Sequence, residues 1–237
     1  YIDICRIYIG SVATLYVVAT PIGNLRDITL RAIDVLKSVD TICCEDTRHS
    51  RKLLSSLAIS KPLTSIRAAN EDNGAGRALA LLDEGKDLAY VTDAGTPAVS
   101  DPGAVFVARV REAEHRIVPV PGPSALTTLM SASGVPVKPL LFEGFMSPKA
   151  GKRRRRLTEL ANRGESFLLY ESPHRLLKLL GELADIVPES TVVIGRELTK
   201  HYEEIAAGSP LELQTRFTNR GVVKGECALL VWPGKMV

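Results

Sequence analysis

Small and rigid residues gather in three short segments of this chain, and one of the segments also contains acidic residues. Residues 91–103 read VTDAGTPAVSDPG, with two aspartates, two glycines and two prolines directly after an apolar run. TPIGN (20–24) and PGPSA (121–125) also follow apolar runs. Glycine lets backbone approach a ligand closely, and proline fixes the shape of a loop. Each segment alone is better explained as a tight turn, but the three together, with two aspartates, favour a ligand site.

The usual phosphate and nucleotide motifs are missing from these segments. A phosphate-binding loop needs GxxxxGK followed by serine or threonine, and a dinucleotide-binding fold needs GxGxxG at the start of a helix. The chain contains neither, and it also lacks the GxGxG of the usual methyltransferases and the GxSxG of hydrolases. The absence of these motifs therefore excludes the common nucleotide-binding and hydrolase classes.

The three segments fall at the ends of predicted strands. Apolar runs predict buried strands at residues 15–20, 41–45, 87–92 and 117–120. Helical patterns lie between and after them, at residues 27–40, from 45 onward, and at 75–86, 102–115 and 124–134. This alternation predicts a mostly parallel sheet, in which ligands bind beyond the carboxyl ends of the strands.

Several helix ends in this half carry recognisable signals. Asp27 is expected to cap the first helix, and Gly134 to end the last one. Asp101 and Pro102 are expected to start the fourth helix, with the proline in its first turn. The segment after Gly134, VPVKP (135–139), predicts a linker.

The second half of the chain alternates again. Its predicted strands lie at residues 140–145, 166–171, 191–195 and 226–232, and its helices at 152–163 and 173–186. Residues 203–217 fit no single pattern. The predicted fold class is α/β, with two α/β domains at residues 14–134 and 139–237. Residues 1–13 are expected to be a poorly ordered lead-in without function.

Composition and cysteine usage narrow the class further. The 237 residues, 45% of them hydrophobic, suffice for two cores, and a net charge of +3 does not by itself identify an anionic partner. None of the four cysteines has CxxC spacing, so we expect reduced thiols, no metal site, and Cys43 and Cys44 as small buried side chains. Reduced thiols predict a cytoplasmic protein. No apolar run reaches the ~18–20 residues of a membrane span, and residues 1–13 do not resemble a signal peptide.

Seven motifs, in order, resemble those of one group of enzymes. They are TPIGNLRD (20–27), EDTR (45–48), DAGTPAVSDPG (93–103), PGPSA (121–125), ESPHR (171–175), RELTK (196–200) and KGE (224–226). The group is the bacterial small-subunit ribosomal RNA cytidine 2′-O-methyltransferases of the tetrapyrrole methylase superfamily. DAGTP and PGPSA are typical of the superfamily, whereas TPIGN, EDTR and ESPHR point to the RNA enzymes. The likeness covers nearly the whole chain, from about residue 15 to residue 231.

The resemblance implies a homodimer that binds S-adenosylmethionine, folded in a cleft between the two α/β domains. It also implies small-subunit ribosomal RNA, or the 30S subunit, as the partner. The residues that it implies for the cofactor all lie in the three segments: Ile22, Gly23, Asp93, Ala94, Gly95, Thr96, Val99, Pro121 and Gly122.

Methyl transfer to a ribose hydroxyl asks the protein to align the two reactants and to accept a proton. The predicted catalytic residues are Glu45, Asp46, Asn70 and Glu71. Arg48 is expected to bind a phosphate, because a guanidinium donates in pairs to phosphate oxygens. A helix cap, in which Asp46 accepts backbone N–H bonds, explains EDTR equally well, and the two roles are compatible.

A run of five cations, residues 152–156, opens a predicted helix. Positive charge is unfavourable at a helix N-terminus, and RNA phosphates would turn that cost into a gain, although a solvated helix start also explains the run. His174 fits a structural role or an RNA contact, Lys200 fits a cofactor or an RNA contact, and Arg196 and Glu197 are expected to pair within the second domain. The predicted RNA-binding residues are Arg48, Lys152, Arg153, Arg154, Arg155, Arg156, His174, Arg175 and Lys200.

Two departures from the group keep two alternatives open. Residues 67–71 read Arg-Ala-Ala-Asn-Glu where members carry His-x-His-Asn-Glu, and the C-terminal extension of many members is expected to be missing after Val237. The missing histidines favour a non-catalytic RNA-binding assembly factor on the same fold. The other alternative is a tetrapyrrole-type small-molecule methylase, although such proteins carry GxGxGD where this chain has TPIGNLRD.

Overall fold

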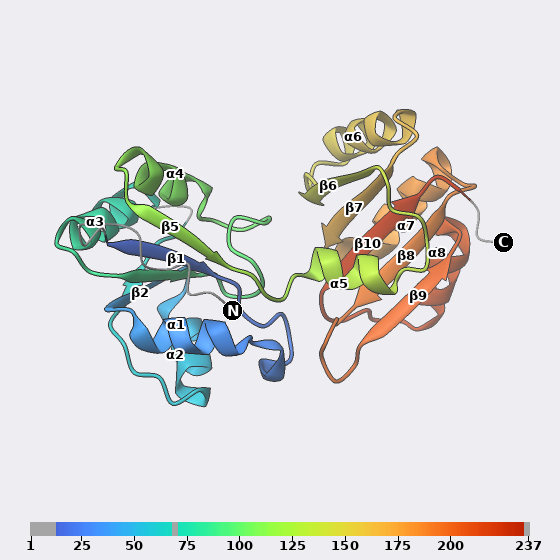
Figure 1. The fold of residues 1–237 in the computed structure, drawn as a ribbon. Helices are drawn as coiled ribbons and strands as arrows, with labels where there is room; N and C mark the ends of the chain where they lie inside the picture. The colour runs from blue at the N-terminus through green and yellow to red at the C-terminus, as the bar shows by residue number, and fades with distance from the viewer. Residues whose placement is uncertain (1–12, 68–70, 235–237) are drawn as a thin grey trace. The chain divides into compact units, whose positions relative to one another are not determined.

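The computed structural model describes residues 13–67 and 71–234. The chain divides into two compact units, residues up to Ser124 and residues from Ala125 onward, which are described separately (Figure 1). Helix α5 (Ala125–Ala132) belongs to the second unit, whereas the sequence predicts it as the end of the first domain. The reason is packing, because α5 contacts strand β10 (Cys227–Trp232) of the second sheet.

The first unit contains a five-stranded sheet in the order β3-β2-β4-β1-β5. Its neighbouring strands are all parallel, which confirms the prediction. The strands are β1 (Thr14–Val18), β2 (Thr41–Cys44), β3 (Leu63–Ser65), β4 (Leu88–Val91) and β5 (Arg116–Val120). The sequence does not predict β3, because this edge strand has only three residues and none of them is fully buried.

Helices cover both faces of this sheet, as Figure 1 shows. Successive side chains of a strand point to opposite faces, so two cores form. Helices α1 (Leu30–Ser38) and α2 (Thr47–Ser56) pack on the face that includes Cys44. Helices α3 (Glu71–Asp83) and α4 (Ala104–Glu112) pack on the face that includes Cys43.

Two helix starts differ from the prediction. Asp27 ends a short 3-10 helix, Leu25–Asp27, and the cap of α1 is Thr29, whose hydroxyl accepts the N–H of Ala32 at 3.0 Å. Pro102 precedes α4, whose cap is Gly103 at a φ of +124°. A Cβ at Gly103 would overlap the buried Tyr90 ring, so only glycine fits there.

The second unit contains a mixed five-stranded sheet in the order β6-β7-β10-β8-β9. Strands β6 (Leu140–Phe145) and β7 (Ser166–Glu171) are parallel. Strand β10 runs antiparallel to β7 and to β8 (Thr191–Arg196), which pairs antiparallel with β9 (Glu204–Gly208). The unassigned segment 203–217 therefore contains β9 and most of α8 (Pro210–Asn219), and the capping box of Ser209 and Glu212 starts this helix.

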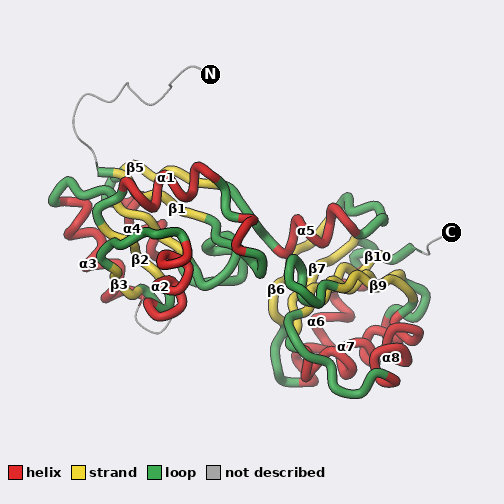
Figure 2. Tube along the Cα trace, turned by 90° about the horizontal axis from the view of Figure 1, so that it is seen from below, coloured by secondary structure: helices red, strands yellow, loops and turns green. Residues whose placement is uncertain are grey.

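Three helices pack against one face of the second sheet (Figure 2): α6 (Ala150–Asn162), α7 (Pro173–Ile186) and α8. Their leucines form a single core with the strand residues that point to the same face. Within residues 13–67 and 71–234, no helix has both the length and the apolar character that a membrane crossing requires.

The cysteines behave as small apolar side chains. Cys43, Cys44 and Cys227 are buried free thiols, as predicted for the first two, and Cys5 lies outside the described residues. Burial raises the pKa of the Cys43 thiol to about 12. Such a thiol is neutral near pH 7 and is a poor nucleophile.

Candidate functional site

The three glycine- and proline-containing loops meet at the carboxyl edge of the first sheet. They follow β1, β4 and β5, which are neighbours in the sheet. Thr20 and Gly95 exchange two backbone hydrogen bonds, at 2.9 Å and 3.1 Å. The Thr96 hydroxyl donates to the Pro123 carbonyl at 3.1 Å. The parallel topology thus joins segments that lie up to a hundred positions apart in the sequence.

Glycine makes this close approach possible. Gly95 has a φ of +81°, and a Cβ there would lie 3.4 Å from the Cγ2 of Ile22. A Cβ on Gly122 would lie 3.0 Å from the Cβ of Ala19. Ala98 and Ser100 also have positive φ values, 65° and 66°, and each such residue costs ~1–3 kcal/mol. The loop after β4 is therefore held in one defined shape by its neighbours.

The predicted cofactor residues lie along this edge. Gly95 is buried between the loops, and the others are exposed or half-buried, so their backbone and side chains face solvent at least in part. The exposed ones are Gly23, Ala94, Pro121 and Gly122, and the half-buried ones are Ile22, Asp93, Thr96 and Val99. Small side chains, open backbone and one carboxylate suit a ligand that carries an apolar part and a positive charge.

Carboxylates from neighbouring strand ends cluster beside these loops. The Asp46 N–H donates to Asp93 Oδ1 at 3.3 Å, and the Asp93 N–H donates to the Glu45 carboxylate. Burial and the nearby Asp93 raise the pKa of Glu45. Burial, followed by Glu45 and Asp93, raises the pKa of Asp101 to about 6. Burial, together with charge repulsion at the ends of β2 and β4, thus makes Glu45 and Asp101 weaker acids than ordinary carboxyl groups.

Asp46 has a different environment from Glu45. Its Oδ1 accepts the Arg48 N–H at 2.8 Å and caps α2, which confirms the predicted cap. Hydrogen bonds from the side chain and backbone of Arg48 lower the pKa of Asp46 to about 2. The Arg48 side chain remains 83% exposed although it pairs with Asp46 at 3.1 Å. Asp46 is therefore the weaker proton acceptor of the two acidic residues.

The segment that departs from the group lies next to Glu45. Arg67, in the place of the first histidine, donates its Nε–H to the Glu45 carbonyl at 3.3 Å. Asn70 lies outside the described residues, and Glu71 is the first residue of α3. An arginine thus follows the end of β3. Its charge lowers the pKa of Glu45, but burial and the charge of Asp93, which raise this pKa, have the larger effects.

Asp101 is the member of this acidic cluster that the sequence does not predict. The sequence places it at the start of the next helix, but α4 begins at Ala104, and Asp101 stays half-buried in the loop. Its carboxylate accepts a hydrogen bond from the Thr92 side chain. A usable signal was present, because Asp101 is the second aspartate of a loop that already contains Asp93.

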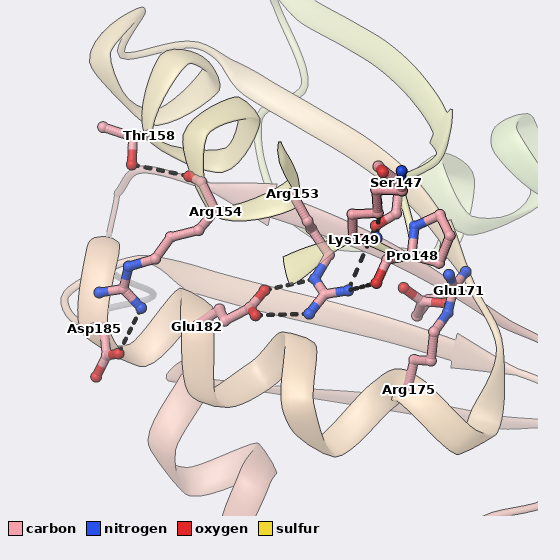
Figure 3. Close-up of polar contacts among 10 residues, drawn as sticks. All are labelled: Ser147, Pro148, Lys149, Arg153, Arg154, Thr158, Glu171, Arg175, Glu182 and Asp185. Carbon is pink, nitrogen blue, oxygen red and sulfur yellow. Dashed lines mark hydrogen bonds and ion pairs between the residues drawn. The ribbon is translucent and has the colours of Figure 1, made fainter. Parts of the chain in front are cut away.

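In the second unit, Arg153 is buried and does not face solvent. Its side chain is 1% exposed, and its Nε and Nη2 donate to Glu182 at 2.6 Å and 2.7 Å (Figure 3). Its Nη1 donates to the carbonyls of Ser147 and Pro148, both at 3.4 Å. The structure thus corrects the prediction that Arg153 contacts RNA, because no part of its charge is available to a partner.

Two further arginines of the run are also paired. Arg154 donates to Asp185 at 2.9 Å, as Figure 3 shows. Arg156 binds Glu143 at 2.9 Å and 2.8 Å and Glu159 at 3.0 Å, and these bonds raise its pKa. Lys152 and Arg155 are exposed, and neither has a carboxylate partner among the described residues. The run is therefore a mixture of compensated and uncompensated charges.

The charged side chains of the last three motifs form ion pairs within the second unit. In ESPHR, the buried Glu171 accepts from Arg175 at 2.6 Å (Figure 3), while His174 is exposed. In RELTK, Lys200 donates to Glu197 at 2.8 Å and to Glu226 of KGE at 3.0 Å. Arg196 pairs with Glu204 rather than with Glu197, and both pairs lie within the second unit. Arg175 and Lys200 thus have structural partners, whatever else they contact.

Comparison with known proteins adds independent findings. A family model described as tetrapyrrole (corrin/porphyrin) methylases matches residues 14–213. The chain is similar to the ribosomal RNA small subunit methyltransferase I of Borrelia garinii subsp. bavariensis, with 47% identity over 92% of this chain and 97% of the relative. The protein of the same name from Bacillus subtilis is 41% identical over 94% of this chain and 76% of the relative.

A solved structure shares the fold. The X-ray structure of cobalt precorrin-4 methyltransferase, a cobalamin biosynthetic enzyme, matches with a TM-score of 0.68 and covers 96% of this chain and 98% of its own. Its sequence identity is 20%, so this likeness concerns the fold alone.

Proposed function

The chain belongs to the tetrapyrrole (corrin/porphyrin) methylase family and is a methyltransferase that uses S-adenosylmethionine, and we propose that it methylates the ribose 2′-hydroxyl of a cytidine in small-subunit ribosomal RNA. The observation that carries the substrate proposal is the 41–47% identity, over more than nine-tenths of the chain, to the relatives named for that RNA. We also propose that the protein is a homodimer, as the resemblance implies, and that it is cytoplasmic, as its free thiols suggest.

The first unit supplies the residues that would hold the cofactor. We infer that the bridged loops around Thr20, Gly95 and Pro123 present the predicted cofactor residues to it. S-adenosylmethionine carries a methyl group that its positive sulfur already activates. The chemistry of this edge suits such a molecule, because open backbone at Ala94 and Gly122 permits close approach and the carboxylate of Asp93 favours a cation.

Within the acidic cluster, we propose Glu45 as the acceptor of the 2′-hydroxyl proton. It is half-buried, and its raised pKa makes it a better proton acceptor than Asp46, whose carboxylate caps α2. Asp46 then serves by holding the start of α2 next to Glu45, and the exposed Arg48 would bind a phosphate. Asn70 and Glu71 keep their predicted role in catalysis.

A transfer experiment tests the function. The protein is incubated with methyl-labelled S-adenosylmethionine and either unmodified 30S subunits or naked ribosomal RNA, and the RNA is digested and analysed by mass spectrometry. We expect the label on a cytidine ribose, and its loss in Glu45→Gln with cofactor binding retained. Cofactor binding without transfer to any RNA would instead support an assembly factor, and transfer to a porphyrin-like ring would support a small-molecule methylase.

A further inference from the structure

The cations at the start of α6 fall into two sets with different surroundings. Arg153, Arg154 and Arg156 are compensated by carboxylates of α7 and β6, namely Glu182, Asp185 and Glu143. Lys149, Lys152 and Arg155 are exposed, and within the described part of the chain none of them has an ion-pair partner. The carboxylate closest along the helix, Glu159, is bound by Arg156 at 3.0 Å.

The second set forms a row. Its members are spaced three residues apart, and residues three apart are neighbours on a helix surface. With a rise of ~1.5 Å per residue, the row extends about 9 Å along α6. Three like charges side by side repel one another, and Lys149, the N-cap of α6, and Lys152, in its first turn, also lie where the helix dipole disfavours positive charge. A polyanion with regularly spaced charges removes both costs.

Arg153 fixes the orientation of this row. A buried guanidinium is costly unless it is fully paired, and Arg153 meets that requirement with a two-bond contact to Glu182 on α7. Figure 3 shows the same side chain directed to the carbonyls of Ser147 and Pro148, just before Lys149. One internal side chain therefore ties α6 to α7 and to the segment that begins the row.

We propose that Lys149, Lys152 and Arg155 form a phosphate-binding row for the RNA substrate, and that Arg153 is the positioning residue that holds the row in place. The proposal rests on the proposed function, which supplies the polyanion. The predicted RNA contact of the whole basic run, residues 152–156, is thus replaced by an RNA contact of three residues. One of them, Lys149, lies outside that run.

The row is tested by RNA binding at several salt concentrations. The variant is Lys149→Gln with Lys152→Gln and Arg155→Gln. The control removes the same charge with Lys37→Gln, Lys61→Gln and Lys86→Gln, which precede β2, β3 and β4 at the opposite, amino edge of the first sheet. We expect the slope of log affinity against log salt to shrink by about 2, since each phosphate contact contributes ~0.7 for single strands. The control should keep the wild-type slope.

An unchanged slope in the row variant would overturn the proposal. Transfer assays on the same samples separate this outcome from failure of the proposed function. If the wild type methylates ribosomal RNA while the row variant binds it normally, only the row is rejected. If the wild type transfers no label to RNA, the function is rejected, and the binding slopes still decide whether the row contacts RNA.

The role of Arg153 needs a variant that folds. Arg153→Met alone leaves Glu182 without its partner, so the double change Arg153→Met with Glu182→Leu is the informative one. We expect its salt slope to equal that of the wild type, with a raised KM for RNA, an unchanged KM for S-adenosylmethionine and an unchanged kcat at saturating RNA. A slope reduced by one phosphate contact would mean that Arg153 touches RNA, and an unchanged KM for RNA would mean that it does not position the row.

Discussion

The carboxyl edge of the first sheet and the start of α6 in the second unit differ in how far their clustered charges are compensated. At the sheet edge, Glu45, Asp93 and Asp101 lie close together, and within the described part of the chain none of them forms an ion pair with a lysine or arginine. On α6, three of the clustered cations are each matched by a carboxylate. Charge left uncompensated costs free energy, so it marks the places where a ligand has something to stabilise.

This difference separates local from distant information. The loops of the sheet edge can be recognised from their own composition, because glycine, proline and aspartate act through their own backbone and side chain. The partner of Arg153, by contrast, lies 29 positions further along the chain. A run of cations in a sequence therefore says little about which of them remain free.

The largest effect that we expect comes from Arg153→Ala. Removal of the guanidinium leaves Glu182, only 11% exposed, as a buried charge without its partner, which typically costs ~3–5 kcal/mol. Arg155→Ala, two positions away and exposed, should change the free energy of unfolding by less than ~0.5 kcal/mol. Urea unfolding of both variants measures the contrast. Equal stabilities would show that Arg153 does not hold the second unit together.

Gly95→Ala should have the next largest effect, at the other region of the comparison. The φ of +81° strains any residue with a Cβ, and the added methyl meets Ile22 at 3.4 Å, so we expect a loss of ~1–2 kcal/mol of stability. The affinity for S-adenosylmethionine, measured by calorimetry, should fall at least about tenfold, because a loss of about 1.4 kcal/mol of binding free energy corresponds to that factor.

Gly134→Ala is the matched control for this change. Gly134 also has a positive φ, +69°, but an added Cβ meets nothing within 4 Å, and the residue lies in the second unit. It should lose a similar amount of stability and keep the cofactor affinity of the wild type. If both glycine variants lost affinity equally, the loops of the first unit would have no special part in cofactor binding.

Much of the fold follows from the sequence because its strands are either wholly apolar or separated by clear turn signals. The apolar run at β4 is buried, those at β1 and β7 are mostly buried, and the cap at Asp46 forms as predicted. Short elements and competing signals are less predictable. Asp27 and Thr29 are both good caps, and only the path of the chain decides that Thr29 receives the Ala32 N–H.

The site is predictable to a similar extent, and for similar reasons. The three loops are visible in the sequence, but the approach of Asp101 to Glu45 depends on the neighbouring positions of β2 and β4, which only the sheet order reveals. Arg153 escaped prediction because burial of a charge needs a partner from another helix. The roles of the site residues in catalysis and binding stay predictions.

Asp101 and Asp46 should respond to pH with opposite signs. The pKa of Asp101 is raised to about 6, so the folded state binds this proton more tightly than the unfolded state, and stability is lost as pH rises from about 4 to about 6. The full change corresponds to ~3 kcal/mol, which we reduce to about 1 kcal/mol because the group is partly solvated. Between pH 4 and pH 7, the stability of Asp101→Asn relative to the wild type should therefore rise by about that amount, as measured by thermal unfolding.

Asp46→Asn provides the contrast within the same cluster. The pKa of Asp46 is lowered to about 2, so its ionised form stabilises the fold above the ordinary carboxyl range, and this contribution is lost as pH falls toward 2. The Asn variant should be less stable than the wild type at neutral pH and should approach it in acid. If the two variants had the same pH dependence, the division of the cluster into a capping and a repelled carboxyl would be incorrect.

The smallest effect should come from the exposed pair on α6. Arg154 and Asp185 join the same two helices as Arg153 and Glu182, at 2.9 Å, but their side chains are 51% and 62% exposed. Solvent screening should limit their coupling to ~0.2–1 kcal/mol in a double-mutant cycle, and 0.5 M salt should reduce it further. The buried pair, tested by the same cycle, should couple several times more strongly and with little salt dependence. Similar coupling energies would mean that burial is not what separates a structural arginine from a free one in this run, and the assignment of Lys149, Lys152 and Arg155 to RNA would lose its basis.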